Sequence, residues 1–299
     1  FGRDFAAFRT FLAPVAPAIK VAGPGTAMMG VGGIPSIETY TPEMYASATP
    51  KPNFDIYSYH YYPALAERCA PVGSPQGVTV DQALTAAWFA RPDVQFQRQK
   101  AVRDSAAPGA PIWLTETGGA ACGGLRWQPA FLDMFRYLDT QGRLIKQGLD
   151  AMFTHALISG SNGIIDEKTY EPNASYWGAV LWSRLMGNRV LDAGAQLPGL
   201  NLYAHCQRGV RGGVTMLAIN YGEAATELPI TGRAQLYLLT GPELQGRTVL
   251  LNGQPLSIGA DNRLPAMDPQ QVGNGRVNLP GRSIGFITLS AANNRACRS

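Results

Sequence analysis

The sequence has no long apolar run and no block of like charges. No stretch approaches the roughly 18 consecutive apolar residues of a membrane-spanning helix, so we expect no membrane span. Lys and Arg together number 25 against 21 for Asp and Glu, which gives a net charge of +4. Because these charges are dispersed, we expect no nucleic-acid partner, while the slight basic excess favours an anionic one.

Short motifs for metal, nucleotide or serine chemistry are also missing. The patterns HExxH, GxxxxGK[ST], GxGxxG after a strand, and GxSxG do not occur, so we expect no metal, no cofactor and no nucleophilic serine. Cysteine is scarce, and Cys69, Cys122, Cys206 and Cys297 show no CxxC spacing. Their even number fits two disulfides in an oxidising compartment, with four buried free thiols as the alternative.

Apolar periodicity predicts alternating helices and strands up to about residue 187. Helices are expected at Phe5–Leu12 before Pro14 and Pro17, near 41–48, from about 79 to 105, around Trp127, Phe131, Phe135 and Leu138, and near 176–186. Strands are expected at 18–22, 54–60 and 111–116 and within 149–158. Such strand–helix units in a row predict a parallel sheet with right-handed crossovers.

After residue 187 the pattern changes. Short apolar or alternating runs are separated by Gly, Asn and Pro turns, which is typical of an antiparallel β-sandwich; these runs are LNLYAHC, VTMLAIN, AQLYLLT, TVLLN and SIGFITL. The expected fold is α/β: the second half of a (β/α)8 TIM barrel in residues 1–187, then an antiparallel β-sandwich domain in residues 188–299. A half-barrel alone would expose the edges of its parallel sheet. Since the chain also begins at Phe1 without an apolar leader, we expect a further N-terminal segment.

Glu116 is the first candidate for catalysis, because it ends an apolar run and is followed by Thr-Gly-Gly. Barrel enzymes keep their catalytic residues at the C-terminal ends of their strands. A structural carboxylate is an equal alternative from the pattern alone. His60 and Tyr62 end the preceding strand, where they could hydrogen-bond a carboxylate, although packed core residues would look the same. His155, near the end of the next strand, is a third candidate.

Two loops add further candidates. Gly123 and Gly124 follow Cys122, and adjacent glycines let backbone N–H groups approach an anion, although a plain loop is the alternative. Tyr176 opens the last expected helix, and its role stays open. We assign its neighbour Trp177 to the core.

The motifs SYHYY, IWLTETGG, SYWGAVLWSRLMG, LYAHC and RACRS follow one another along the chain. Together they resemble the C-terminal two thirds of glycoside hydrolase family 79, the heparanases and related β-glucuronidases. The resemblance implies a retaining mechanism, with Glu116 as nucleophile and His60 and Tyr62 beside it. It further implies a set of residues that bind the glucuronate carboxylate, namely Gly123, Gly124 and Tyr176. It also implies the disulfide Cys206–Cys297, which by elimination leaves Cys69 and Cys122 as a second pair.

The acid/base Glu of this family lies in an Asn-Glu-Pro motif, which this chain does not contain. The resemblance therefore implies a separate N-terminal chain or segment as partner. The implied function is that of a secreted or periplasmic endo-β-glucuronidase acting on heparan sulfate or a related acidic glycosaminoglycan. The alternatives are an exo-β-glucuronidase or a hyaluronan-cleaving relative. Less favoured are a catalytically inactive carbohydrate-binding homologue and an adhesive sandwich protein with a vestigial half-barrel.

Overall fold

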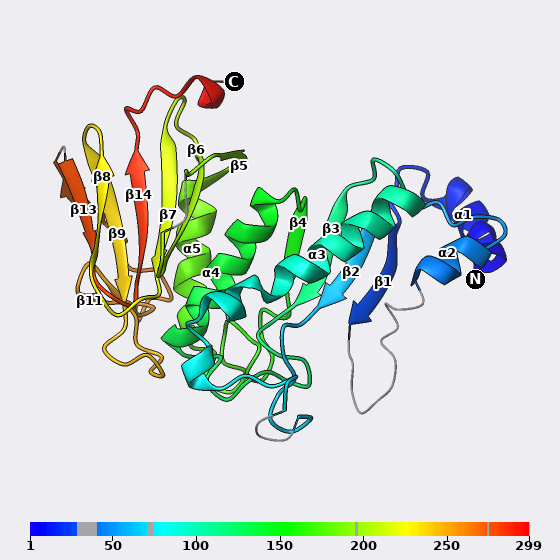
Figure 1. The fold of residues 1–299 in the computed structure, drawn as a ribbon, viewed down its shortest axis with the longest axis horizontal. Coiled ribbons are helices and arrows are strands. Elements are labelled where there is room, and N and C mark those ends of the chain that lie inside the picture. The colour runs from blue at the N-terminus through cyan, green and yellow to red at the C-terminus, as the bar shows by residue number, and fades with distance from the viewer. Residues whose placement is uncertain (29–40, 71–73, 195–196, 274, 299) are drawn as a thin grey trace.

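A four-stranded parallel sheet and an eight-stranded antiparallel sheet frame the molecule, with helices between them (Figure 1). The computed structural model describes residues 1–28, 41–70, 74–194, 197–273 and 275–298. Within these ranges, no helix combines the length and the apolar character that crossing a bilayer would require.

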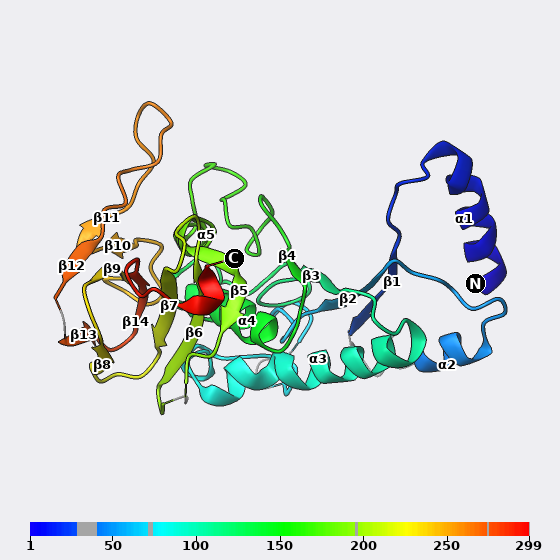
Figure 2. The same cartoon turned by 90° about the horizontal axis from the view of Figure 1, so that it is seen from above.

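The parallel sheet has the order β1-β2-β3-β4, and all of its pairs are parallel, which confirms that prediction. Its strands are β1 (Ala22–Met28), β2 (Ile56–Tyr61), β3 (Ile112–Thr117) and β4 (Ala151–Thr154). The helices are α1 (Gly2–Val15), α2 (Thr41–Ser47), α3 (Ala86–Ala106), α4 (Phe131–Lys146) and α5 (Ala174–Leu185). Seen from above, α3 runs along the parallel sheet, and α1 lies at the end away from the antiparallel sheet (Figure 2).

The side chains of β3 alternate between two environments, as those of a strand must. Ile112 and Leu114 are fully buried and share an apolar cluster with Phe96 of α3. Trp113 points to the other face, where its ring lies 5.6 Å from that of Phe153. Phe153 is 47% exposed, so this face of the sheet carries aromatic groups that the described residues leave partly uncovered.

The first strand lies further along the chain than expected. Residues 18–22 were expected to form it, but β1 begins at Ala22 and includes the Gly-Pro-Gly sequence. Pro24 is tolerated because β1 is an edge strand. Gly23 is required by packing, since a Cβ there would lie 2.2 Å from the ring of Phe54.

Two helix boundaries also differ from the prediction. The segment expected as one helix from about 79 is broken, because a short 3-10 turn at Val80–Gln82 comes first. The helix α3 then begins after Thr85, whose hydroxyl accepts from the N–H of Trp88. Trp127 lies before α4 and not on it. It belongs to a turn in which the N–H of Ala130 donates to the carbonyl of Trp127. Its side chain is buried, as expected.

The antiparallel sheet has the order β11-β10-β9-β14-β7-β6-β5, with β12 also paired to β9. Its strands are β5 (Met186–Leu191), β6 (Leu200–Gln207), β7 (Val214–Asn220), β9 (Ala234–Thr240), β10 (Leu250–Leu251), β11 (Gln254–Pro255), β12 (Gln270–Val272) and β14 (Ser283–Leu289). A second sheet pairs β8 (Thr226–Ile230) with β13 (Gly275–Leu279) and packs on it through a shared apolar cluster. The expected apolar runs all form strands. The half-barrel, the sandwich and the division at residue 187 stay predictions.

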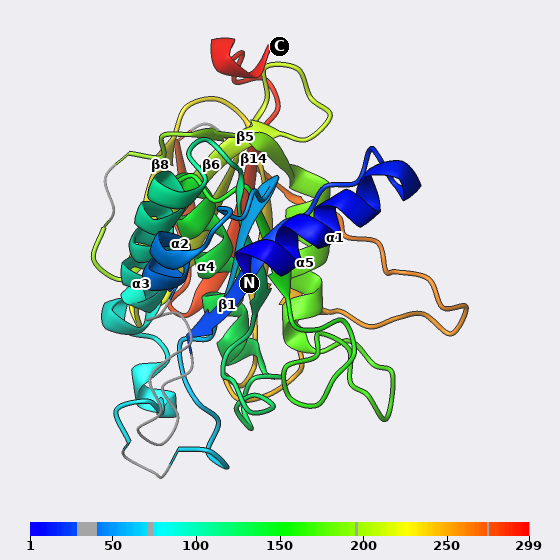
Figure 3. The ribbon, with the colours of Figure 1, turned by 90° about the vertical axis from the view of Figure 1, so that its right-hand side faces the viewer.

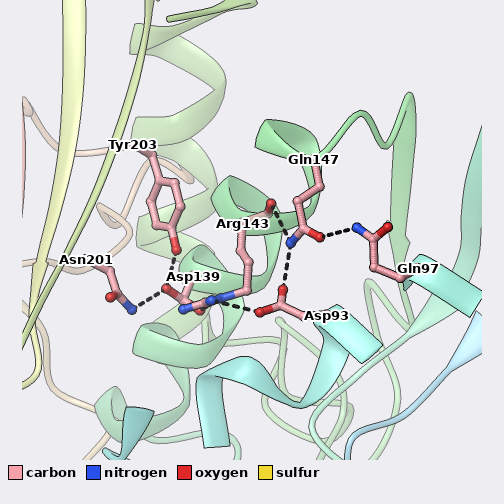
Figure 4. A network of polar contacts seen from close by, with 7 residues as sticks. All are labelled: Asp93, Gln97, Asp139, Arg143, Gln147, Asn201 and Tyr203. Carbon is pink, nitrogen blue, oxygen red and sulfur yellow. Dashed lines mark hydrogen bonds and ion pairs between the residues drawn. The ribbon is translucent and has the colours of Figure 1, made fainter. Parts of the chain in front are cut away.

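The helices α4 and α5 lie between the two large sheets (Figure 1). Viewed along the long axis, α2 and α3 lie together on one side of β1 (Figure 3). The apolar cluster around α4 and α5 contains Leu138 and Trp177 from these two helices together with Tyr203 and Phe286 from the antiparallel sheet. A polar network crosses the same contact (Figure 4). At its centre, the buried Asp139 accepts hydrogen bonds from both helix and sheet.

Candidate active site

The register of the parallel sheet brings Glu116 and His60 together. In the parallel β2–β3 pair, His60 is the partner of Glu116. Both lie at the C-terminal ends of their strands, and Tyr62 follows one residue after β2 ends. A group from each of two neighbouring strands therefore reaches the same edge of the sheet, as expected from the sequence.

Both oxygens of the Glu116 carboxylate have partners. The hydroxyl of Tyr62 donates to Oε1 at 2.8 Å, and Nδ1 of His60 lies 3.4 Å from Oε2. Burial and the hydrogen bond to Glu116 both raise the pKa of Tyr62, so this tyrosine stays protonated and donates. The Glu116 side chain is 37% exposed. It is thus held in one orientation while remaining open to a ligand.

A glycine-rich loop follows Glu116. Gly123 and Gly124 have φ values of +95° and +87°, which other residues rarely adopt. A Cβ at Gly124 would also come within 2.9 Å of the Asn162 backbone nitrogen. Both the backbone conformation and the close packing therefore exclude a side chain at Gly124, and the loop is one in which glycine is required.

Gln128 and Asn162 position this loop, and sequence reasoning missed both. Each is about 5% exposed. The Gln128 side-chain amide donates to Oδ1 of Asn162 at 2.5 Å, and the Asn162 amide donates to the carbonyl of Ala120 at 3.1 Å. Oε1 of Gln128 also accepts from the N–H of Leu125. Both lie outside regular elements, so no periodic pattern could mark them as buried.

The structure contains two disulfides, Cys69–Cys122 and Cys206–Cys297, which are the expected pairs. The first joins the loop after β2 to the loop after β3. Backbone hydrogen bonds run alongside it, with Ala66 donating to Ala121 at 2.9 Å. The loops beside Glu116 are therefore covalently connected.

The remaining candidates lie on α5 and just after β4. Trp177 is buried, which confirms its assignment to the core. The half-buried ring of Tyr176 packs edge-on against it, with centroids 5.3 Å apart. His155 follows β4, and its N–H donates to the carbonyl of Thr117, while its side chain is exposed. Among the described residues, neither Tyr176 nor His155 is bonded to the Glu116 carboxylate.

No cluster of three or more His, Cys, Asp or Glu residues suited to a metal ion occurs in the described ranges. The arrangement offers instead an accessible carboxylate that accepts a hydrogen bond from Tyr62, contacts His60 and lies next to a glycine-rich loop. Such a carboxylate can act as a nucleophile or a base.

Comparison with known proteins finds relatives of one kind, while no protein-family model matches the chain. Inactive heparanase-2 of Mus musculus is 32% identical over 232 residues, covering 68% of this chain and 39% of that protein. Baicalin-β-D-glucuronidase of Scutellaria baicalensis is 31% identical over 198 residues, covering 58% and 37% respectively. Heparanase of Mus musculus is 28% identical, covering 68% and 42%. The chain thus spans less than half the length of these relatives.

Solved structures agree at the level of fold. A 4-O-α-L-rhamnosyl-β-D-glucuronidase from Fusarium oxysporum superposes with a TM-score of 0.66 and 15% identity, over 96% of this chain and 64% of that one. An α-L-arabinofuranosidase from Thermotoga maritima superposes with a TM-score of 0.64 and 15% identity, over 97% of this chain and 61% of that one. The structural neighbours are glycoside hydrolases of the TIM-barrel type.

Proposed function

Because this chain is a homologue of the heparanases and β-glucuronidases of glycoside hydrolase family 79, we propose that it carries the nucleophile of a retaining β-glucuronidase. The observation that carries the proposal is the Glu116 carboxylate, held at both oxygens by Tyr62 and His60. It lies where barrel enzymes place their catalytic residues, at the C-terminal ends of parallel strands.

In this mechanism Glu116 attacks the anomeric carbon and forms a glycosyl-enzyme. A second carboxyl group protonates the leaving oxygen and later activates the water that releases the sugar. Retention requires the two carboxyl groups to be about 5–5.5 Å apart. The hydrogen bond from Tyr62 and the contact with His60 hold the Glu116 carboxylate in a fixed direction, which lowers the entropic cost of reaching the transition state.

The second carboxyl group comes, in this proposal, from a separate N-terminal chain or segment that completes the barrel. Residues 1–187 then form the second half of the barrel and residues 188–299 the β-sandwich. Exposed apolar side chains support the presence of a further segment that covers them: Phe153 on the parallel sheet is 47% exposed and Phe11 on α1 is 66% exposed. Groups of this kind are normally covered in a parallel-sheet protein. Native mass spectrometry that finds only the 299-residue species in active material would contradict this part.

The substrate that we propose is heparan sulfate, cut internally at β-glucuronidic bonds. Gly123, Gly124 and Tyr176 would bind the glucuronate carboxylate, the glycines through their backbone N–H groups. The two disulfides support a secreted or extracellular location, where such polymers occur. Product sizes from heparan sulfate decide the mode of cleavage, because oligosaccharides indicate endo action and single uronic acids indicate exo action.

A catalytically inactive carbohydrate-binding protein is the second candidate, because one relative is an inactive heparanase-2. The test uses the full-length protein with Glu116→Gln, assayed on a small aryl β-glucuronide. We expect turnover to be lost while the unfolding midpoint is unchanged. Glu171→Gln, an exposed carboxylate on the β4–α5 loop, is the matched control and should keep full activity. Retained turnover in Glu116→Gln refutes the nucleophile, and no turnover in the unsubstituted protein favours the binding function.

A further inference from the structure

A cavity lies beside the C-terminal segment, and Glu116 is not among the residues that line it. It has a volume of about 570 Å³, within the range of ligand-binding pockets. Its walls are β5, the end of β6 with the turn that follows, and the C-terminal 3-10 turn η3 (Arg295–Cys297). In Figure 1 the C-terminal segment stands at the top, whereas the arrowheads of β1 and β2 point to the lower side, where the loops around Glu116 begin.

The lining of this cavity is strongly basic. Four exposed arginines contribute to it, namely Arg189, Arg208, Arg211 and Arg298. No Asp or Glu lines the cavity, and within the described parts of the chain none of these arginines forms an ion pair. Four guanidinium groups around one hollow make a positive potential that is not neutralised locally.

Three of the four arginines form hydrogen bonds to neutral oxygen atoms, so these bonds do not neutralise their charge. Nε of Arg208 donates to the carbonyl of Met186 at 3.2 Å, and Nε of Arg211 donates to the carbonyl of Arg298 at 3.0 Å. The guanidinium of Arg298 donates to the side-chain oxygen of Asn293 at 2.6 Å. Neutral oxygens thus orient these side chains, and the positive charge remains available to a ligand.

The wall that carries these groups is covalently fixed. The Cys206–Cys297 disulfide lines the cavity and ties η3 to the end of β6. The backbone segments that carry Arg208 and Arg298 are therefore held together before a ligand binds, which lowers the entropic cost of binding.

We infer that this cavity is a second binding site, separate from Glu116, for a stretch of anionic polysaccharide. Planar guanidinium groups match the geometry of sulfate and carboxylate oxygens, often with two hydrogen bonds each. No aromatic residue lines the cavity, and single-stranded nucleic acids usually need aromatic faces for stacking. The chemistry therefore favours a sulfated or carboxylated sugar chain over a nucleic acid.

The test measures binding of a size-defined heparin oligosaccharide to the full-length protein by calorimetry at several salt concentrations. Arg189→Gln/Arg211→Gln removes two charges from the cavity. Arg233→Gln/Arg263→Gln removes two exposed charges elsewhere on the antiparallel unit and is the matched control. We expect about tenfold weaker binding in the cavity variant and less than twofold in the control, with a shallower salt dependence in the cavity variant alone.

Equal losses in the two variants, or no loss in either, overturn the inference. So does a thymidine oligonucleotide that binds as tightly as heparin and loses affinity by the same factor, since the cavity would then be a general polyanion site. Circular dichroism and the unfolding midpoint confirm that each variant is folded. Turnover of an aryl β-glucuronide by the unsubstituted protein is measured separately, because its absence would contradict the proposed function and not the cavity.

Discussion

Asp139 is the centre of a network that links α4 to the antiparallel sheet. Asp139 is fully buried, and its carboxylate accepts from Nε of Arg143 at 2.9 Å, from the Asn201 amide at 2.6 Å and from the Tyr203 hydroxyl at 2.5 Å (Figure 4). Burial raises the pKa of Asp139, while Arg143 and the two hydrogen-bond donors act in the opposite direction. The substitution Asp139→Asn keeps the shape and removes the charge.

The expected loss of unfolding free energy follows from the charge of Arg143, which the substitution leaves without Asp139. Removing one partner of a buried ion pair costs about 3–5 kcal/mol, because the other charge loses its compensation. Here Arg143 keeps Asp93, whose carboxylate lies 3.1 Å away, so the lower end applies and we expect about 3 kcal/mol. In the variant, the side-chain NH₂ group replaces one carboxylate oxygen, so it faces a hydrogen-bond donor from which that oxygen accepted. With a urea m-value of about 3 kcal/mol/M, the unfolding midpoint should fall by about 1 M.

The assay is urea unfolding followed by tryptophan fluorescence. Glu227→Gln is the control, since its carboxylate is 56% exposed and pairs with Arg276 at the surface; we expect a change within about 1 kcal/mol. If Asp139→Asn is no more destabilising than this control, the buried network does not hold α4 against the antiparallel sheet, and the reasoning fails.

Three further predictions concern the site, the disulfide and pH. Tyr62→Phe removes the charge-assisted donor to Glu116, worth about 1.5–3 kcal/mol, so kcat on an aryl β-glucuronide should fall about 10–100-fold; an unchanged kcat contradicts the orienting role. Cys297→Ser opens the bridge to Cys206 across 91 residues, and we expect a loss of about 4–5 kcal/mol in denaturant unfolding, which disappears when both proteins are compared in reductant. Burial lowers the pKa of His205 from its usual 6.5, so the unfolded state binds the proton more tightly and stability is lost as pH falls through about 6.5. His205→Gln should flatten the dependence of the unfolding midpoint between about pH 7 and 5, and parallel curves for the two proteins would show that another group is responsible.

Local apolar patterns predicted most elements to within a few residues. The run at 111–116 became β3 (Ile112–Thr117), and the expected helix at 176–186 became α5 (Ala174–Leu185). These segments were predictable because burial on one face imposes a period on neighbouring residues. The strand β1 was misplaced because its Gly-Pro-Gly sequence indicates a turn locally, and only packing against Phe54 and an edge position makes it a strand.

The contacts that organise the site and that hold α4 against the antiparallel sheet have no local signal. Gln128 and Asn162 are 34 residues apart, and Asp139 and Asn201 are 62 apart. A polar residue that will be buried by a distant segment looks, in sequence, like any surface residue. Whether such groups meet depends on strand register, helix crossing and loop path, which are properties of the whole chain.

By itself, the sequence indicated that Glu116 lies near the end of an apolar strand, that His60 and Tyr62 lie at or just after the end of the strand before it, and which family this order of motifs resembles. Tertiary structure alone decided that the carboxylate is held at both oxygens, since Tyr62 reaches it from 54 residues away. It alone also gathered arginines from β5, the β6–β7 turn and the C-terminus around one cavity. Periodicity records which face of an element is buried, whereas the meeting of charged side chains depends on how separate elements pack.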